Sequence, residues 1–117
     1  MAQKEKQLLL VDLCARLPYG FTVHRYSDNR DITFGKNELD EFAHFLEYSE
    51  GEKFKPYLRP MSSMTEDEEI YYNTVYTRLK FYEKEDWLNA HHFDYRGLIP
   101  MGLALEAPEG MYKTESL

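Results

Sequence analysis

The sequence has a single cysteine, a single tryptophan and no long apolar run. With Cys14 alone, no disulfide can form within the chain, which fits a reducing compartment. The apolar run Leu8–Val11 is too short for the core of a secretion signal, since Asp12 and Arg16 follow closely. No segment approaches the length of a membrane span. We therefore expect a cytoplasmic protein without a membrane partner.

Positive charge is also scarce. The chain carries 14 Lys and Arg against 21 Asp and Glu, a formal net charge of −7. Because an acidic chain repels phosphate groups, direct nucleic-acid binding is not expected. The acidity could serve solubility alone, or the protein could be an acidic DNA-mimic inhibitor. The acidic residues are interspersed with Lys and Arg, whereas a mimic needs an unbroken array.

The length of 117 residues fits one domain with a core of its own. Ten Tyr and seven Phe predict that this core is rich in aromatic rings. We expect a single α+β domain over residues 1–108, with about three to four helices packed on a small antiparallel sheet. Residues 109–117 are expected to form a flexible C-terminal tail.

The N-terminal segment has helical periodicity followed by an alternating pattern. Residues 4–17 are predicted to form a helix that ends before Pro18. Its expected buried stripe consists of Leu10, Leu13, Cys14 and Leu17. Residues 21–26 and 31–35 have the composition of two strands joined by a polar turn. We therefore expect a β-hairpin with His24 on its solvent face.

The segment 36–52 has apolar residues at helical spacing. In a helix they would share one face, with Asn37 as the N-terminal cap and Gly51 at the end. These apolar residues are Leu39, Phe42, Phe45 and Leu46. The spacing favours a helix here.

Two further segments are marked by proline and glycine. Two prolines within 55–63 predict an extended connector, with Tyr57 and Leu58 against the core. Arg59 in this connector could pair with an acidic group or be solvated. Residues 101–106 alternate between apolar and other residues, which predicts a strand that joins the hairpin in one sheet.

Residues Thr65 to Glu68 have the pattern of a helical capping box. The threonine hydroxyl would accept a hydrogen bond from the third helical amide, and the Glu68 carboxylate would accept one from the Thr65 amide. A helix should therefore begin after Thr65. Its expected buried stripe consists of Tyr71, Val75, Leu79 and Tyr82.

The face that carries Trp87, His91 and Tyr95 is roughly opposite to that stripe, at 100° per residue. A straight helix would have to bury two opposite sides, so we expect a break near 82–86 and a further helix over 86–93. The tryptophan should belong to the core. Its expected partners are Leu10, Leu13 and Leu17 of the first helix.

His91, His92 and Asp94 are the candidate metal ligands. Adjacent helical residues diverge by 100°, so the two histidines are not well placed to chelate one ion. A structural role is expected instead, with one histidine beside an aromatic ring and the other at the end of the helix. A metal-assisted hydrolase or nuclease would be centred on these three residues. Its acid–base set would consist of Asp86, His91 and Asp94, with Arg96 as a further member.

The sequence contains no phosphate-binding glycine loop and no nucleophile motif. The main hypothesis is therefore a non-enzymatic module, without a cofactor, that binds an unidentified protein partner. Its contact patch would use aromatic residues at the helix margins. These are Tyr57, Tyr72, Tyr76 and Phe81. The metal-assisted hydrolase and the DNA mimic are the alternatives.

Three blocks of sequence resemble a family of uncharacterised small proteins from phages and mobile elements of gut Bacteroides-type bacteria. They are DLCARLPYG (12–20), KPYLRPMSSMT (55–65) and DWLNAHHFDYRGLI…GLALEAPEGMY (86–112). The resemblance implies an accessory protein, and it brings no established activity, cofactor or catalytic residue. It also implies a strand-rich middle, so 36–52 could form a pair of strands instead of a helix.

Overall fold

The computed structural model describes residues 3–48 and 54–112, which form an α+β domain, as the composition predicted. The four helices are α1 (Gln3–Arg16), α2 (Leu39–Tyr48), α3 (Glu66–Asn73) and α4 (Phe81–Ala90). The four strands are β1 (Phe21–Arg25), β2 (Arg30–Phe34), β3 (Phe54–Leu58) and β4 (Leu105–Glu106). Within these ranges no helix has the length and apolar character needed to cross a membrane.

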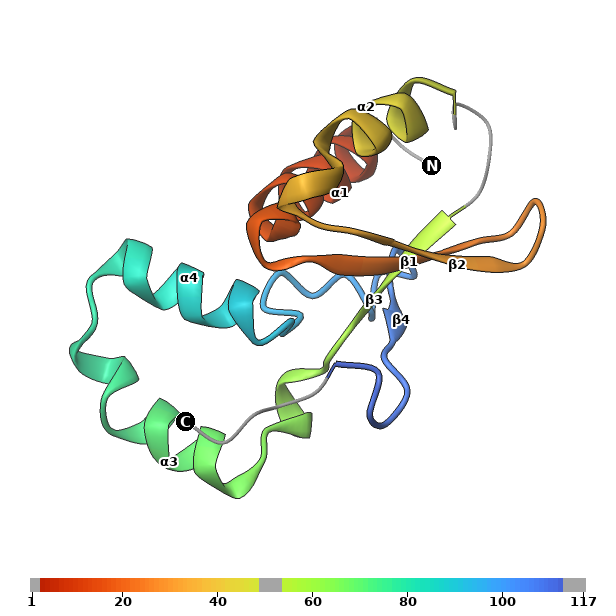
Figure 1. Cartoon of the computed structure of the whole chain (residues 1–117). Coiled ribbons are helices and arrows are strands. Elements are labelled where there is room, and N and C mark those ends of the chain that lie inside the picture. The colour runs from red at the N-terminus through yellow and green to blue at the C-terminus, as the bar shows by residue number, and fades with distance from the viewer. Residues whose placement is uncertain (1–2, 49–53, 113–117) are drawn as a thin grey trace.

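The sheet has the strand order β2-β1-β3-β4 (Figure 1). β1 is antiparallel to both β2 and β3, as expected for the hairpin, but β4 runs parallel to β3. The expectation of a purely antiparallel sheet is therefore wrong, and the sheet is mixed. β4 is also shorter than the strand expected at 101–106 and pairs with β3, not with the hairpin. Gly102 at φ +76° and turn bonds to the carbonyls of Leu98 and Ile99 curl the preceding residues away from a strand.

Proline occupies an inner strand of this sheet. Pro56 lies opposite Val23 of β1, and the parallel pairing with β4 begins only at Tyr57. In an antiparallel ladder, hydrogen-bonded and non-hydrogen-bonded pairs alternate. Pro56 has no N–H, so its pair must be a non-hydrogen-bonded one. Pro56 therefore fits this inner strand, because β1 needs no hydrogen bond from an amide at this position.

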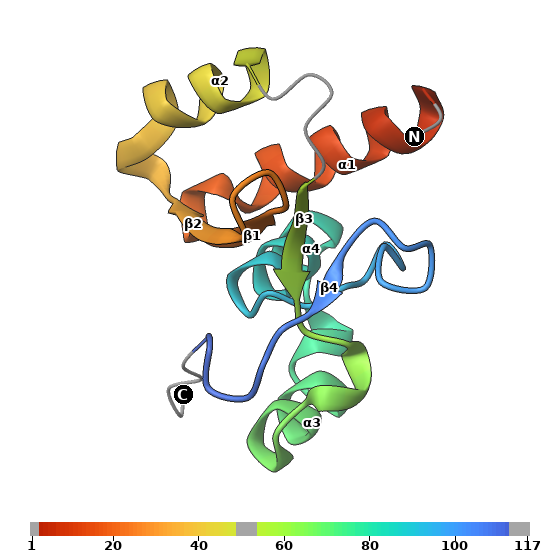
Figure 2. The same cartoon turned by 90° about the vertical axis from the view of Figure 1, so that its right-hand side faces the viewer.

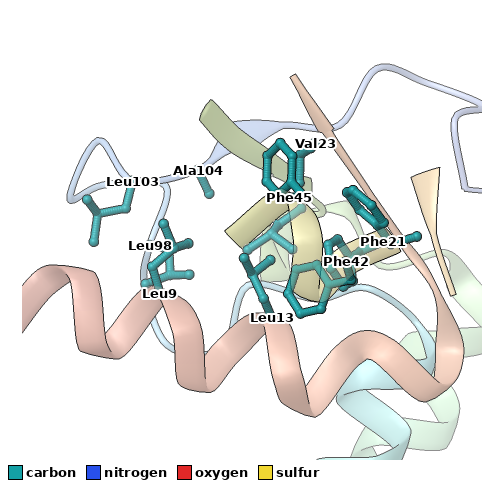
Figure 3. Close-up of a cluster of buried hydrophobic side chains, with 11 residues drawn as sticks. Leu9, Leu13, Phe21, Val23, Phe42, Phe45, Leu98, Leu103 and Ala104 are labelled. Carbon is teal, nitrogen blue, oxygen red and sulfur yellow. The ribbon is translucent and has the colours of Figure 1, made fainter. Parts of the chain in front are cut away.

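α1 and α2 lie on the same side of the β1–β2 hairpin and enclose the main core (Figures 1 and 3). The core consists of Leu9, Leu13, Phe21, Val23, Phe34, Phe42, Phe45, Leu58, Leu98, Leu103 and Ala104, which we call the sheet core. The other face of the hairpin carries His24 at its predicted outward position, where Nδ1 is 2.8 Å from the Asp31 carboxylate.

The described part of 36–52 is helical, which decides between the two interpretations of that segment. α2 begins at Leu39, after a 3₁₀ turn that includes the expected cap Asn37. Phe42 and Phe45 are buried as predicted, but Leu39 is 58% exposed. The side chain of Leu46, and the expected helix end at Gly51, lie outside the described residues.

The buried face of α1 differs from the predicted stripe. Its fully buried members include Asp12, Leu13 and Arg16, whereas Cys14 is exposed. Asp12 and Arg16 pair with each other, so both can face the interior. The apolar run 8–11 extends around more than one full turn of this helix, and for that reason periodicity alone did not identify the buried side.

The α3–α4 region begins as the sequence predicts and then departs from it. The capping box is present: the Glu68 amide donates to Thr65 Oγ1 at 3.2 Å, and the Thr65 amide donates to Glu68 Oε1 at 2.9 Å. α3 ends at Asn73, however, and the Thr74 hydroxyl donates back to a carbonyl of the helix. α4 starts at Phe81, so the break falls at 74–80 and not at 82–86. The second helix accordingly spans 81–90 and not 86–93.

We call residues 66–90 the helical arm, because they extend away from α1 and α2 (Figures 1 and 2). Because the helix ends early, two residues of the expected buried stripe face solvent: Val75 and Tyr82 are 46% and 60% exposed. Trp87 is 8% exposed, as a core residue should be. It does not pack on the leucines of α1 but forms a separate tryptophan cluster. This cluster contains Trp87, Leu88 and Phe93, with Met61, Met64, Tyr71, Tyr72, Tyr76 and Tyr95 around them.

Candidate functional site

A buried ion pair joins the sheet to the helical arm. Arg59 directly follows β3, and Glu68 lies in the first turn of α3. Arg59 Nη1 and Nη2 donate to the two Glu68 carboxylate oxygens at 2.9 and 2.7 Å, and both side chains are less than 10% exposed. The guanidinium also donates to the carbonyls of Ser63 and His91 and lies 4.3 Å from the ring centroid of Phe93. Of the two expectations for Arg59, pairing with an acid is the correct one.

The surroundings of Glu68 keep its carboxylate ionised at neutral pH. Burial alone would raise the pKa of Glu68. The hydrogen bonds from Arg59 and from the Thr65 amide, the charge of Arg59 and the hydrogen bond with His91 outweigh burial and lower this pKa to about 2. His91 Nδ1 lies 2.9 Å from Glu68 Oε2, and the His91 ring packs 4.6 Å from that of Trp87. The base of the arm is therefore fixed by the Glu68 carboxylate, which is bonded to the side chains of both Arg59 and His91.

A second ion network ties α1 to the segment after α4. Arg16 donates to both carboxylate oxygens of Asp12, at 2.7 and 3.0 Å, and to the Phe93 carbonyl at 2.6 Å. Arg96 donates to the same carboxylate at 2.8 Å. The two arginines flank the ring of Tyr95, at 5.4 and 4.6 Å from its centroid. Desolvation of these charges is offset by pairing and by hydrogen bonds to the backbone.

Three sequence blocks, residues 12–20, 55–65 and 86–112, contribute to these two networks. Of the six buried polar or charged residues in the described part of the chain, all except Glu68 belong to the blocks. The five are Asp12, Arg16, Arg59, Asn89 and Asp94. The detailed sequence of the blocks therefore corresponds to an interior polar seam and not to a surface pocket.

The three candidate metal ligands serve separate structural contacts. His91 bonds to Glu68, and His92 stacks on Tyr112 with ring centroids 3.8 Å apart. Both carboxylate oxygens of Asp94 accept hydrogen bonds from backbone amides, those of Leu98 and Ile99, at 2.8 and 2.9 Å. In the described residues, no three His, Cys, Asp or Glu side chains form a group that could hold a metal ion.

The proposed acid–base set is not assembled either. Asp86 is exposed and lies near Tyr19, whose pKa is raised by burial and by this carboxylate. Arg96 is committed to Asp12, and Asp94 to the backbone. These side chains do not converge on one point where a substrate could react.

The four aromatic residues predicted to form a contact patch fall into three environments. Tyr57 is on the outer face of the sheet, where its hydroxyl donates to Asp31 at 3.1 Å. Tyr72 and Tyr76 stack on each other with centroids 4.5 Å apart, beside Trp87. Phe81 alone projects into solvent and is 77% exposed. The four rings therefore do not form one patch.

Three further apolar residues on the arm are exposed together with Phe81. Ile70, Val75 and Tyr82 are 57%, 46% and 60% exposed. The sequence did not identify these residues as exposed, because Val75 and Tyr82 fit a buried helical stripe with Tyr71. The β-branched pair Thr74-Val75 lowers the helix propensity slightly at the break, and this is a weak local signal. We call Ile70, Val75, Phe81 and Tyr82 the Phe81 surface.

Comparisons with protein-family models, with curated proteins and with solved structures found no match to this chain.

Proposed function

We propose that this chain is a non-enzymatic interaction module that binds another protein through the Phe81 surface. The observation that carries the proposal is the 77% exposure of Phe81, the first residue of α4, in a segment that also exposes Ile70, Val75 and Tyr82. Exposed apolar side chains that gather on one region of a surface commonly mark a contact site, and these four lie within 13 consecutive residues of the chain. Aromatic residues are enriched in the buried centres of interfaces and often dominate their energetics.

The helical arm has a core of its own, the tryptophan cluster. The exposure of the Phe81 surface is therefore not explained by a lack of packing in the arm. Trp87 stacks with Tyr71 at 5.2 Å and contacts Tyr72 and Tyr76, so the inner side of the arm is already filled. The capping box and the Arg59–Glu68 pair fix the start of α3. A surface that is rigid before binding loses less conformational entropy when the complex forms.

The charges near Phe81 indicate the kind of partner surface. Arg78 and Lys80 are exposed and directly precede Phe81 in the chain. Exposed Glu69 and Glu83 lie next to Ile70 and Tyr82, so an apolar pocket whose rim carries charges of both signs would complement this arrangement.

The origin of the protein is part of the same proposal. The three blocks that resemble phage and mobile-element proteins support an accessory role in such an element. A gene located among phage or integrative-element genes is the expected result of mapping its neighbourhood. A place in a chromosomal housekeeping operon would count against this origin and leave the Phe81 surface to be tested separately.

Photo-crosslinking in the native host tests the binding proposal. Benzoylphenylalanine is placed at position 81 and, in a control protein, at position 39, where Leu39 is comparably exposed on α2. We expect a defined protein adduct from position 81 and none from position 39. Excess wild-type protein should suppress the adduct, while excess Phe81→Ser protein should not. Identical adducts from both positions, or equal competition by the two proteins, would refute the assignment.

A further inference from the structure

Tyr112 fills an interruption in the ladder between β1 and β3. Pairing of these strands stops at Val23 and Pro56, and the next opposed residues are Thr22 and Tyr57. Because Pro56 occupies a non-hydrogen-bonded pair, a direct N–H···O=C bond is due at this next position. Instead, the Thr22 amide donates to the Tyr112 hydroxyl at 2.9 Å, and the hydroxyl donates to the Tyr57 carbonyl at 2.8 Å.

The ring of Tyr112 is held as specifically as its hydroxyl. It stacks on the His92 imidazole at a centroid distance of 3.8 Å and an interplanar angle of 12°. His92 has φ +65°, a conformation that non-glycine residues rarely adopt. Burial, together with nearby positive charges, lowers the pKa of His92 to about 4, and burial raises the pKa of Tyr112. Both rings are therefore uncharged at neutral pH.

Tyr112 is attached to the fold by a short tether. The last backbone bond from this end of the chain to the rest of the fold runs from the Ala107 amide to the Leu58 carbonyl at 2.8 Å, and the later bond from the Met111 amide to the Pro108 carbonyl stays within the tether. Residues 108–110 are exposed. Among the described residues, both hydrogen bonds that tie 108–112 to the rest of the fold are made by the Tyr112 hydroxyl. Tyr112 is therefore held by its side chain, as a bound ligand would be, and is linked to its binding site only by a short exposed segment.

We propose that the gap between β1 and β3 is a recognition site for the phenol of a tyrosine side chain, and that Tyr112 occupies it as a displaceable internal ligand. The site offers one donor, one acceptor and one flat uncharged ring. An extended segment of another protein that presents a tyrosine can make the same contacts once Tyr112 leaves. The site is built from residues outside the Phe81 surface, and its existence does not depend on the role of that surface.

The direct test is a titration of Tyr112→Ala protein with 4-methylphenol, followed through the Thr22 amide and the His92 imidazole by NMR. We expect saturable shifts and an affinity at least tenfold higher than for toluene, which lacks the hydroxyl. Wild-type and Tyr112→Phe proteins should respond at least tenfold more weakly because their own ring fills the gap. A capped peptide containing tyrosine should likewise bind the Ala variant better than its phenylalanine counterpart.

Three other outcomes of this titration would each contradict the proposed phenol site. Equal binding of toluene would show an apolar cavity without phenol recognition. An equal response of wild-type protein would place the binding elsewhere, and the absence of saturable shifts in folded Tyr112→Ala protein would exclude a site. If this variant is unfolded alone, 4-methylphenol must restore its dispersed spectrum where toluene does not, and failure to do so would also overturn the proposal.

Discussion

Arg59 and Glu68 form a bidentate ion pair inside the protein, with nitrogen–oxygen distances of 2.9 and 2.7 Å. The pair connects the end of β3 to the first turn of α3. Glu68 also completes the capping box by accepting the Thr65 amide at 2.9 Å. One carboxylate thus starts the helical arm and anchors it to the sheet, so the orientation of the Phe81 surface depends on it.

Replacing Glu68 by Gln should destabilise the fold strongly. The variant leaves the Arg59 charge buried without a counter-charge, and breaking a buried pair typically costs about 3–5 kcal/mol. The free energy of unfolding in urea measures the loss. Glu69→Gln is the matched control, because its exposed neighbouring carboxylate should change stability by less than about 0.5 kcal/mol. Similar small effects for both variants would show that the ion pair does not hold the arm.

The same carboxylate predicts a loss of stability in acid. The pKa of Glu68 falls from 4.5 to about 2 on folding, so its contribution is fully present above pH 4.5. It should decline as the pH falls from 4.5 towards 2. Comparing urea unfolding of wild-type and Glu68→Gln proteins across this window isolates the effect. A difference between the two that stays constant with pH would contradict the lowered pKa.

His92 should give a second acid-sensitive window at higher pH. Its pKa falls from 6.5 to about 4 on folding, so the folded state binds fewer protons between these values. Stability should therefore fall as the pH drops from 6.5 to 4, by at most about 3 kcal/mol. His92→Asn, which tolerates positive φ, should flatten the profile. An unchanged slope in this variant would show that His92 is not held neutral by burial.

Trp87 and Leu13 belong to separate apolar clusters, and their substitutions should act independently. The effects of Trp87→Phe and Leu13→Val on unfolding free energy should add within about 0.5 kcal/mol. Trp87→Phe and Tyr71→Leu should instead be coupled by about 0.5–1.5 kcal/mol, since the two rings stack. The reverse pattern of coupling would place the tryptophan against α1, as sequence periodicity alone suggested.

Tyr112→Phe should cost about 1–3 kcal/mol of stability, because the Thr22 amide and Tyr57 carbonyl lose their shared partner. Tyr26→Phe is a suitable control, since Tyr26 is 39% exposed on the hairpin. Thermal unfolding measures both. Equal melting temperatures for the two variants would mean that the hydroxyl of Tyr112 is not a structural bond.

Local patterns in the sequence were sufficient to predict the capping box at Thr65 and Glu68, the hairpin and the helix that begins at Leu39. These features depend on neighbouring residues, whose chemistry is readable from the chain. The buried side of α1 was missed because Asp12 and Arg16 face inward only when partners distant in sequence, such as Arg96, are in place. Polar residues that pair over long sequence separations carry no local signal.

The candidate site was recovered only in part for the same reason. Phe81 was expected at the margin of a helix and is 77% exposed, but the stripe with Tyr71 placed Val75 and Tyr82 inside. The outcome depended on whether the helix continued past Asn73, and Thr74 leaves the helical conformation at φ −122° and ψ −80°. Tyr112 was missed in a similar way, because it was assigned to the expected tail at 109–117. Its hydrogen-bond partners belong to two strands that are distant in sequence. Residues 113–117 lie outside the described structure.

The most direct test of the central claim is the dissociation constant of the crosslinked partner for wild-type, Phe81→Ser and Leu39→Ser proteins, measured by calorimetry. Phe81→Ser should weaken binding at least tenfold, about 1.4 kcal/mol, as expected for an aromatic residue central to an interface. Leu39→Ser should change the constant less than about twofold, because surface apolar residues outside a contact contribute little. Equal dissociation constants for wild-type and Phe81→Ser proteins would contradict the assignment of this surface.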